Sequence, residues 1–224
     1  MKKFYSLPAT ILICSFCLFN DTYVNAQNYQ WAKSSGSQGA DYVQSVATDV
    51  DGNIFVVGRF QSSSITFGST TLTNADTTNS TEDVFLTKYD ANGNVLWAKC
   101  AGGMGYEGGY SCATDAAGNV YITGNFSSAS ITFGTTTLTK AGYTDMFIAK
   151  YDPDGNVLWA KSAGTSYDDF GYSCSIDSSG NVYVTGYFQN ASITFETITL
   201  TNVGGADIFI VKYDASGNVL WAKS

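Results

Sequence analysis

A sequence repeat of 62 residues constrains the fold of this chain more than any other feature. The tripeptide Trp-Ala-Lys begins at four positions, spaced 66, 62 and 62 residues apart: Trp31, Trp97, Trp159 and Trp221. The tracts Ile-Thr-Phe and Asp-x-Phe-x-x-Lys-Tyr-Asp return with the same spacing. The additional residues of the first repeat fall within 74–82, and a structural repeat tolerates insertions that are confined to one loop. The chain is therefore expected to build one structural unit three times.

Each repeat contains short runs of β-branched and aromatic residues separated by turn signals. The first strand of the first repeat is expected over residues 43–49. In the second repeat, strands are expected over 120–126 and 145–152, with a small Ile-Thr-Phe/Thr-Leu-Thr hairpin between them. Two Asp-x-x-Gly-Asn turns per repeat connect neighbouring strands, and their Gly supplies the positive φ of a type I turn with a bulge. Four antiparallel strands per unit are typical of a β-propeller blade.

The predicted fold is all-β, with blades of four-stranded antiparallel sheet over residues 42–99, 109–161 and 171–223. Residues 28–33 precede these blades as an orphan strand that repeats only the fourth strand of a blade. Propellers close with about four to eight blades, and three blades leave strand edges uncovered. We therefore expect an incomplete or open propeller, which either continues with blades beyond residue 224 or oligomerises to close the ring.

The motifs of the repeat resemble those of a known family. The tracts Asp-x-x-Gly-Asn-Val-Tyr-Val-Thr-Gly, Asp-x-Phe-x-x-Lys-Tyr-Asp and Gly-Asn-Val-Leu-Trp-Ala-Lys are together similar to the SBBP-type bacterial β-propeller repeat. The resemblance covers residues 29–224, and the motifs recur together three times. It implies an extracytoplasmic propeller that is commonly part of a larger surface or secreted protein, and it supplies no general catalytic motif.

Residues 1–26 have the layout of a secretory signal peptide. Lys2 and Lys3 precede an apolar run over 11–19, and Ala26 is a small residue before a cleavage site at Gln27. The apolar run is too short to span a bilayer, which takes about 20 apolar residues. Residues 27–224 are therefore predicted to form the repeat domain of a secreted or cell-surface protein, without membrane insertion.

Charge and residue types argue against several functions. The formal charge of −8 disfavours a nucleic-acid partner, because phosphate binding needs a basic surface. The chain has no histidine, which removes histidine-based catalysis and His-ligated zinc. Outside the signal peptide, Cys112 and Cys174 share one repeat position and are expected to be buried, whereas pairing of Cys100 with Cys112 is left open. We expect no catalytic residue, no metal and no cofactor.

The connections opposite the Asp-x-x-Gly-Asn turns vary most between repeats, and such loops are where propellers usually bind. They carry the candidate ligand-binding residues Asp41, Tyr42, Tyr106, Glu107, Tyr167, Asp168, Asp169 and Phe170. Asp41, Glu107 and Asp169 form a column that is acidic in every repeat. Either these carboxylates accept backbone N–H groups of the neighbouring blade, or they form a ring at the channel mouth that attracts a cation or sugar hydroxyls. The aromatic residues suit stacking on a sugar or contact with a protein.

Two other columns are interpreted as structural. The four Trp residues are expected in the blade core. Lys88, Lys150 and Lys212 alternate with apolar neighbours and are expected to be solvated.

Three functions fit these patterns. The leading hypothesis is a secreted, non-enzymatic module that binds carbohydrate or protein through its varied loops. A propeller glycoside hydrolase or lyase-type enzyme would need a carboxylate pair such as Asp168 and Asp169, but no pair departs from the repeat. The third hypothesis is a purely structural spacer of a larger surface protein.

Overall fold

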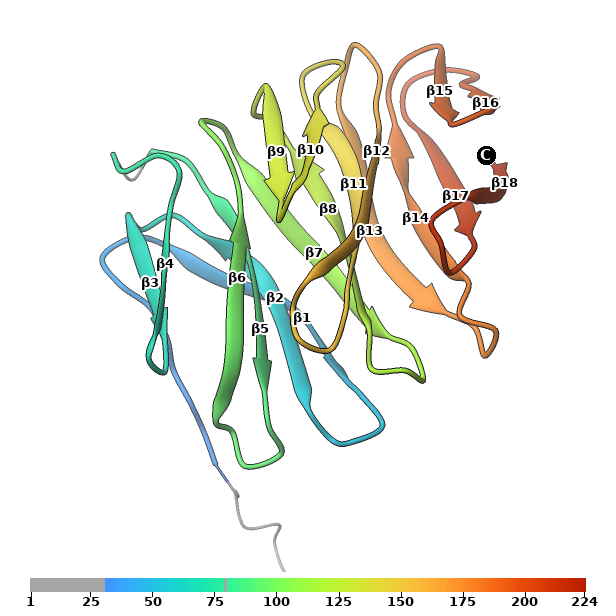
Figure 1. Ribbon diagram of the computed structural model, residues 1–224. Coiled ribbons are helices and arrows are strands. Elements are labelled where there is room, and N and C mark those ends of the chain that lie inside the picture. Colours follow the sequence, from blue (N-terminus) through green and yellow to red (C-terminus); the bar gives the residue numbers. More distant parts are fainter. Residues whose placement is uncertain (1–30, 79) are drawn as a thin grey trace, which may run out of the picture. The chain divides into compact units, whose positions relative to one another are not determined.

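The computed structural model describes residues 31–78 and 80–224 (Figure 1). The predicted signal peptide and residues 28–30 of the predicted orphan strand lie outside this part of the chain. All regular secondary structure within it is β-strand. It contains no helix of the length and apolar character that a membrane span requires.

Three four-stranded antiparallel sheets form three successive blades. The first blade contains β1 (Asp41–Thr48), β2 (Ile54–Phe60), β5 (Asp83–Tyr89) and β6 (Val95–Ala101). The second contains β7 (Glu107–Thr114), β8 (Val120–Phe126), β11 (Asp145–Tyr151) and β12 (Val157–Ala163). The third contains β13 (Asp169–Ile176), β14 (Val182–Phe188), β17 (Asp207–Tyr213) and β18 (Val219–Lys223). Within each blade the strands lie side by side in chain order, which confirms the predicted all-β blade.

A two-stranded hairpin connects the second and third strands of each blade, as predicted. These hairpins are β3 (Ser64–Phe67) with β4 (Thr70–Thr73), β9 (Ser130–Phe133) with β10 (Thr136–Thr139), and β15 (Ser192–Phe195) with β16 (Ile198–Thr201). The first strand of each blade begins earlier than predicted. Strand β1 begins at Asp41, not at residue 43, because Asp41 and Tyr42 already pair with Phe60 and Arg59.

The Asp-x-x-Gly-Asn turns have the predicted geometry. In the turn after β7, Asp115 Oδ1 accepts the backbone N–H groups of Ala117 and Asn119, each at 3.0 Å. Its Oδ2 accepts the side-chain amide of Asn119 at 2.8 Å, and Gly118 has φ 78°. The Asp side chain therefore satisfies the turn's own amides, and Gly provides the left-handed conformation that other residues disfavour.

The core lies between successive blades. Phe55, Val57 and Val84 of the first blade pack in one cluster with Ile122 and Phe147 of the second. Strands β5 and β11 are buried at every position, because other blade elements cover both faces of these strands. Strand β17 has an alternating pattern instead, in which one face is half-buried to exposed.

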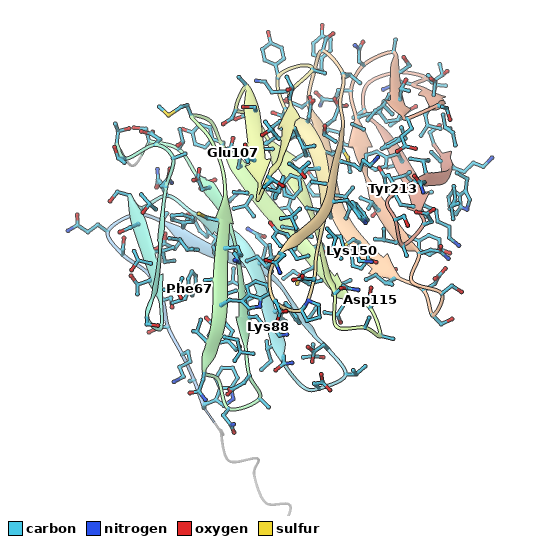
Figure 2. The ribbon with its side chains drawn as sticks, viewed as in Figure 1. Phe67, Lys88, Glu107, Asp115, Lys150 and Tyr213 are labelled. Atoms are coloured by element: carbon cyan, nitrogen blue, oxygen red, sulfur yellow. The ribbon has the colours of Figure 1, made fainter. Side chains whose placement is uncertain are left out.

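The lysine column is not solvated, and that prediction is wrong for Lys88 and Lys150, each 6% exposed. Lys150 and Asp115, both labelled in Figure 2, belong to the same blade, and Lys150 Nζ lies 3.6 Å from Asp115 Oδ2. Lys150 Nζ also donates to the carbonyl of Ala215 in the third blade at 3.1 Å. Lys88 makes the equivalent bond to Pro153 at 3.1 Å. A lysine can be buried where a carboxylate, a carbonyl and an aromatic face all receive its ammonium group.

The two cysteines that share one repeat position are buried, as predicted. Cys112 and Cys174 are buried, and Sγ of Cys112 lies 3.6 Å from Oγ of Ser45 in the first blade. Cys100 is an exposed thiol on β6 with its Sγ 3.8 Å from the carbonyl oxygen of Thr73. The structure contains no bond between Cys100 and Cys112, which are both free.

Candidate functional site

The varied connections meet at one end of the blades, the loop end, because each strand reverses the direction of the one before it. There, every inter-blade connection is tied to the preceding blade. Glu107 donates its backbone N–H to the carbonyl of Glu82 at 2.8 Å, and Asp169 donates to that of Thr144 at 2.8 Å. These bonds fix the position of the loops that carry the predicted ligand-binding residues.

The predicted acidic column does not form an exposed ring. Glu107 and Asp169 are buried, so the alternative in which these two carboxylates belong to a ring at a channel mouth is wrong. Glu107 accepts Gly103 N at 3.0 Å, Ser128 N at 3.0 Å and Ser128 Oγ at 2.6 Å. Asp169 Oδ2 accepts the backbone N–H and hydroxyl of Thr165 at 2.6 and 2.8 Å.

Asp41 occupies the same repeat position and is half-buried. It accepts Ser37 N at 3.0 Å and Ser62 Oγ at 3.4 Å. The three carboxylates of the column therefore accept backbone N–H groups, as the first of the two interpretations predicts. The donors, however, lie in the connection before each carboxylate or in a loop of its own blade, and not in a neighbouring blade.

Burial also changes the proton affinity of these acids. It raises the pKa of Glu107, and it raises the pKa of Asp169 to about 6. Asp83, the first residue of β5, lies close to Glu107 and to Gly102, where a Cβ would collide with the Asp83 carboxyl. Burial and then the charge of Glu107 raise the pKa of Asp83 to about 6. These buried carboxyl groups hold loops together in this arrangement.

The predicted aromatic residues do reach the surface. Tyr42, Tyr106 and Tyr167 are exposed, and Phe170 is half-buried. Tyr167 lies beside Tyr143, another exposed residue of the loop end, with ring centroids 6.3 Å apart.

A larger aromatic group lies on the first two strands of the second and third blades. It consists of Tyr110, Phe170, Tyr172 and Tyr187, which we call the tyrosine cluster. The ring of Phe170 stacks on those of Tyr187 and Tyr172, with centroids 5.2 and 5.8 Å apart. Tyr110 approaches from the second blade, with its centroid 5.6 Å from that of Tyr172. The half-buried Asp168 lies near enough to contribute to the raised pKa of Tyr187, which burial brings to about 12.

Of the tyrosine cluster, the sequence analysis predicted only Phe170 and did not identify Tyr110, Tyr172 and Tyr187. A signal for two of them was present in the repeat. Tyr110 and Tyr172 share one repeat position, and each is the extra residue of a β-bulge, between Gly109 and Ser111 in β7 and between Gly171 and Ser173 in β13. A bulge turns its extra side chain out of the regular alternation, so strand periodicity did not place these rings.

The first blade contributes a polar edge to the same region. The guanidinium of Arg59 lies 5.0 Å from the ring centroid of Tyr42, and its Nε lies 3.3 Å from Glu82 Oε2. The Arg59 charge also acts on Tyr110, where it opposes the effect of burial, which raises the pKa of that tyrosine. Arg59, which was not among the predicted residues, therefore connects Tyr42 to the tyrosine cluster.

Metal binding has no support from this arrangement. Among residues 31–78 and 80–224, no three His, Cys, Asp or Glu side chains gather as a metal site would require. The expected absence of a metal stays a prediction.

Comparisons with known proteins agree with the fold. Residues 159–187 match the family described as SBBP, beta-propeller repeat. The chain is 29% identical over 175 residues to an uncharacterized WD repeat-containing protein, L264, of Acanthamoeba polyphaga mimivirus, covering 64% of this chain and 13% of that protein. It is 25% identical over 179 residues to the regulatory protein FlaEY of Caulobacter vibrioides, covering 79% of this chain and 18% of that protein. The chain thus spans less than a fifth of either relative.

Proposed function

We propose that this chain, an SBBP-type β-propeller repeat protein, is a secreted, non-enzymatic module that binds a protein partner through the tyrosine cluster and the exposed tyrosines of the loop end. The observation that carries the proposal is the cluster itself. Four aromatic rings from two blades lie together, and Tyr172 is 49% exposed.

The chemistry of this surface suits a protein interface. Tyrosine rings offer apolar area with a polar tip, and they lose little conformational entropy when they are fixed. Arg59 at the edge adds a charged hydrogen-bond donor, and Tyr and Arg are enriched at the energetic centres of interfaces. The names of the two relatives, one with WD repeats and one regulatory, are consistent with a role in protein interaction.

A carbohydrate is the second candidate ligand. The nearly parallel rings of Phe170 and Tyr187, inclined at 18°, extend a flat aromatic face beside the carboxylate of Asp168. A sugar ring can stack on such a face while its hydroxyls bond to an acid. Its support is weaker, because Phe170 and Tyr187 are both half-buried.

The non-enzymatic part of the proposal rests on the acids. A glycosidase needs two carboxyl groups that flank the scissile bond. Glu107 and Asp169 are buried and accept loop hydrogen bonds, so either would have to release its loop to reach a substrate. The secreted part rests on the signal-peptide layout of residues 1–26, and the N-terminal sequence of exported protein should begin at Gln27.

The proposal is tested by binding with matched variants. The immobilised chain is exposed to the extracellular protein fraction of its host and, separately, to a glycan array. We expect a protein to bind the wild type, and Phe170→Ala combined with Tyr172→Ala to abolish that binding. The control Val50→Ala combined with Leu158→Ala changes exposed apolar residues outside the cluster and should bind normally. Equal binding by both double variants would contradict the proposal, and binding to glycans alone would favour the carbohydrate.

A further inference from the structure

Each junction between blades repeats one arrangement of two donors and one acceptor. At the first junction, Trp97 Nε1 and Lys88 Nζ both donate to the carbonyl of Pro153 in the second blade, at 3.0 and 3.1 Å. At the second junction, Trp159 Nε1 and Lys150 Nζ both donate to the carbonyl of Ala215 in the third blade, at 3.2 and 3.1 Å. The lysine and tryptophan of one blade therefore bind a carbonyl in the second Asp-x-x-Gly-Asn turn of the following blade.

The third blade presents the same donors without an acceptor. Lys212 and Trp221 stand at the repeat positions of Lys150 and Trp159, and in the described residues neither donates to a carbonyl of a following blade. Lys212 is nevertheless held as its counterparts are, 3.2 Å from Asp177 Oδ2 and 4.8 Å from the ring centroid of Tyr183. The donor pair is thus arranged before any partner arrives.

The apolar surface beside these donors is also uncovered. Val84 and Met146 are 1% and 0% exposed at the first and second junctions, whereas Ile208 at the same repeat position is 77% exposed. A groove of about 550 Å³ beside it is lined by Ile208, Ile210 and Thr185, and also by Tyr172 of the tyrosine cluster. This face of the third blade is therefore an exposed apolar surface at the position where a following blade covers the first and second blades.

The first blade carries the complementary half on its other side. Val46 is 62% exposed, whereas Cys112 and Cys174 at the same repeat position are each 7% exposed. At the existing junctions the backbone N–H of this position donates to a serine of the preceding blade, Cys112 to Ser45 at 3.3 Å and Cys174 to Ser111 at 3.1 Å. The equivalent serine of the third blade, Ser173, is exposed.

Trp31 occupies the place that a preceding blade would use. Its Nε1 donates to the carbonyl of Ala91 at 3.1 Å, and its ring packs over Gly93 as Trp97 packs over Gly155. Trp31 is 36% exposed and belongs to the segment before the first blade, so its removal breaks no sheet. An incoming Trp221 would compete with it for the Ala91 carbonyl.

We propose that the free face of the third blade docks on the first blade of a second copy of this chain, and that Trp221 of one copy displaces Trp31 of the other from Ala91. Both halves of the junction are present in one chain, which is the reason to assign the site to a second copy. The described blades of two copies number six, which lies within the range of about four to eight in which propellers close.

The test is sedimentation equilibrium of the full chain over a range of concentrations. The expected species is a dimer with twice the mass of one copy. Ile208→Asp and Lys212→Met should each weaken dimerisation at least tenfold, whereas Trp31→Ala should strengthen it because the competitor is gone. Leu158→Asp, which changes an exposed apolar residue on β12, is the control and should leave the dissociation constant unchanged. Circular dichroism verifies that each variant is folded.

Three outcomes would overturn the proposal. A wild type and a Trp31→Ala variant that both stay monomeric would assign the free face to another partner, such as a further blade of the same repeat. A dimer insensitive to Ile208→Asp would place the interface elsewhere, and open-ended assembly would exclude a closed pair. Ile208 and Lys212 lie outside the tyrosine cluster, although Tyr172 of that cluster lines the same groove. Ile208→Asp and Lys212→Met therefore test the dimer, whereas capture of a protein other than this chain tests the proposed binding function.

Discussion

The ammonium group of Lys150 lies 3.6 Å from the carboxylate of Asp115, at the junction between the second and third blades. Its hydrogen bond to the Ala215 carbonyl joins the two blades at the same point. Lys150→Met should therefore lower the free energy of unfolding by about 2–4 kcal/mol, because the half-buried Asp115 would lose its cation and the hydrogen bond between the blades would be lost. Lys212→Met is the matched control, since Lys212 pairs with Asp177 where no further described blade follows. It should cost clearly less than Lys150→Met in dilute solution, because the Lys212 pair is more exposed to solvent. Denaturant unfolding of both variants measures the difference, and equal losses would contradict it.

Stability should rise when the solution is mildly acidified. Asp83 and Asp169 have folded pKa values of about 6, raised from 3.8, so the folded state holds protons that the unfolded state has released. Their contribution is fully present below 3.8 and is lost as pH rises to about 6. Hydrogen bonds from Asn119 and Asn181 lower the pKa of Asp115 and Asp177, so these turn carboxylates lose their contribution as pH falls below about 4.

The melting temperature should therefore be highest between about pH 4 and 5 and lower at pH 7. Thermal unfolding across this range measures it. In the double variant Asp83→Asn, Asp169→Asn the decline between pH 5 and 7 should become smaller, and the raised pKa of Glu107 accounts for part of what remains. A wild type that is most stable at pH 7 would show that burial of these acids is not what governs the profile.

Glu196 should be replaceable by glycine with a gain in stability. It has φ 54°, whereas the same hairpin position in the other blades is Gly68 and Gly134. Left-handed backbone costs a residue with a side chain about 1–2 kcal/mol, and the exposed ion pair of Glu196 with Lys161 returns only about 0–1 kcal/mol. Glu196→Gly should raise the free energy of unfolding by up to about 1 kcal/mol.

Glu196→Gln separates the two effects, because it retains the strain and removes the charge. Its small loss should vanish in high salt, where surface ion pairs are screened. If Glu196→Gly were less stable than Glu196→Gln, the backbone argument would be wrong.

Binding should depend on the loop end and not on the turns at the opposite end. Tyr106→Ala combined with Phe170→Ala should remove the ligand signal, because both rings lie at the loop end and Phe170 is central to the tyrosine cluster. Substitution of Asn94 and Asn156 with Ala should lower stability, since their side chains bond to Asp90 and Asp152 at 2.8 Å, and should leave binding intact. Isothermal titration with the captured partner compares the two sets.

The blade could be predicted from sequence because its signals are local. Strand alternation, the Asp-x-x-Gly-Asn turns and the hairpins each depend on residues within one repeat, and β8 lies over 120–126 as predicted. The exposure of the lysine column was predicted wrongly because the carbonyl group that accepts each buried lysine's hydrogen bond lies in the next blade. For Lys88 this carbonyl belongs to Pro153, 65 positions along the chain. The environment of Glu107 depends on Ser128, 21 residues away, and so its burial could not be read from the acidic column alone.

The aromatic surface was predicted only in part, for the same reason. Tyr42, Tyr106 and Tyr167 are exposed at the loop end, where the varied loops indicated them. The stacking of Tyr110 on a ring of the third blade depends on how two blades pack, and no motif within a repeat encodes that distance.

The central claim is that the loop end of this propeller binds a protein through its tyrosine cluster. It is tested most directly by photo-crosslinking in the host cell, with a benzophenone amino acid placed at Tyr172 or, as the control at the opposite end, at Val50. We predict one discrete cross-linked species from position 172 that disappears when Phe170→Ala is added, and none from position 50. Cross-linking of the same species from both positions, or from position 50 alone, would contradict the account.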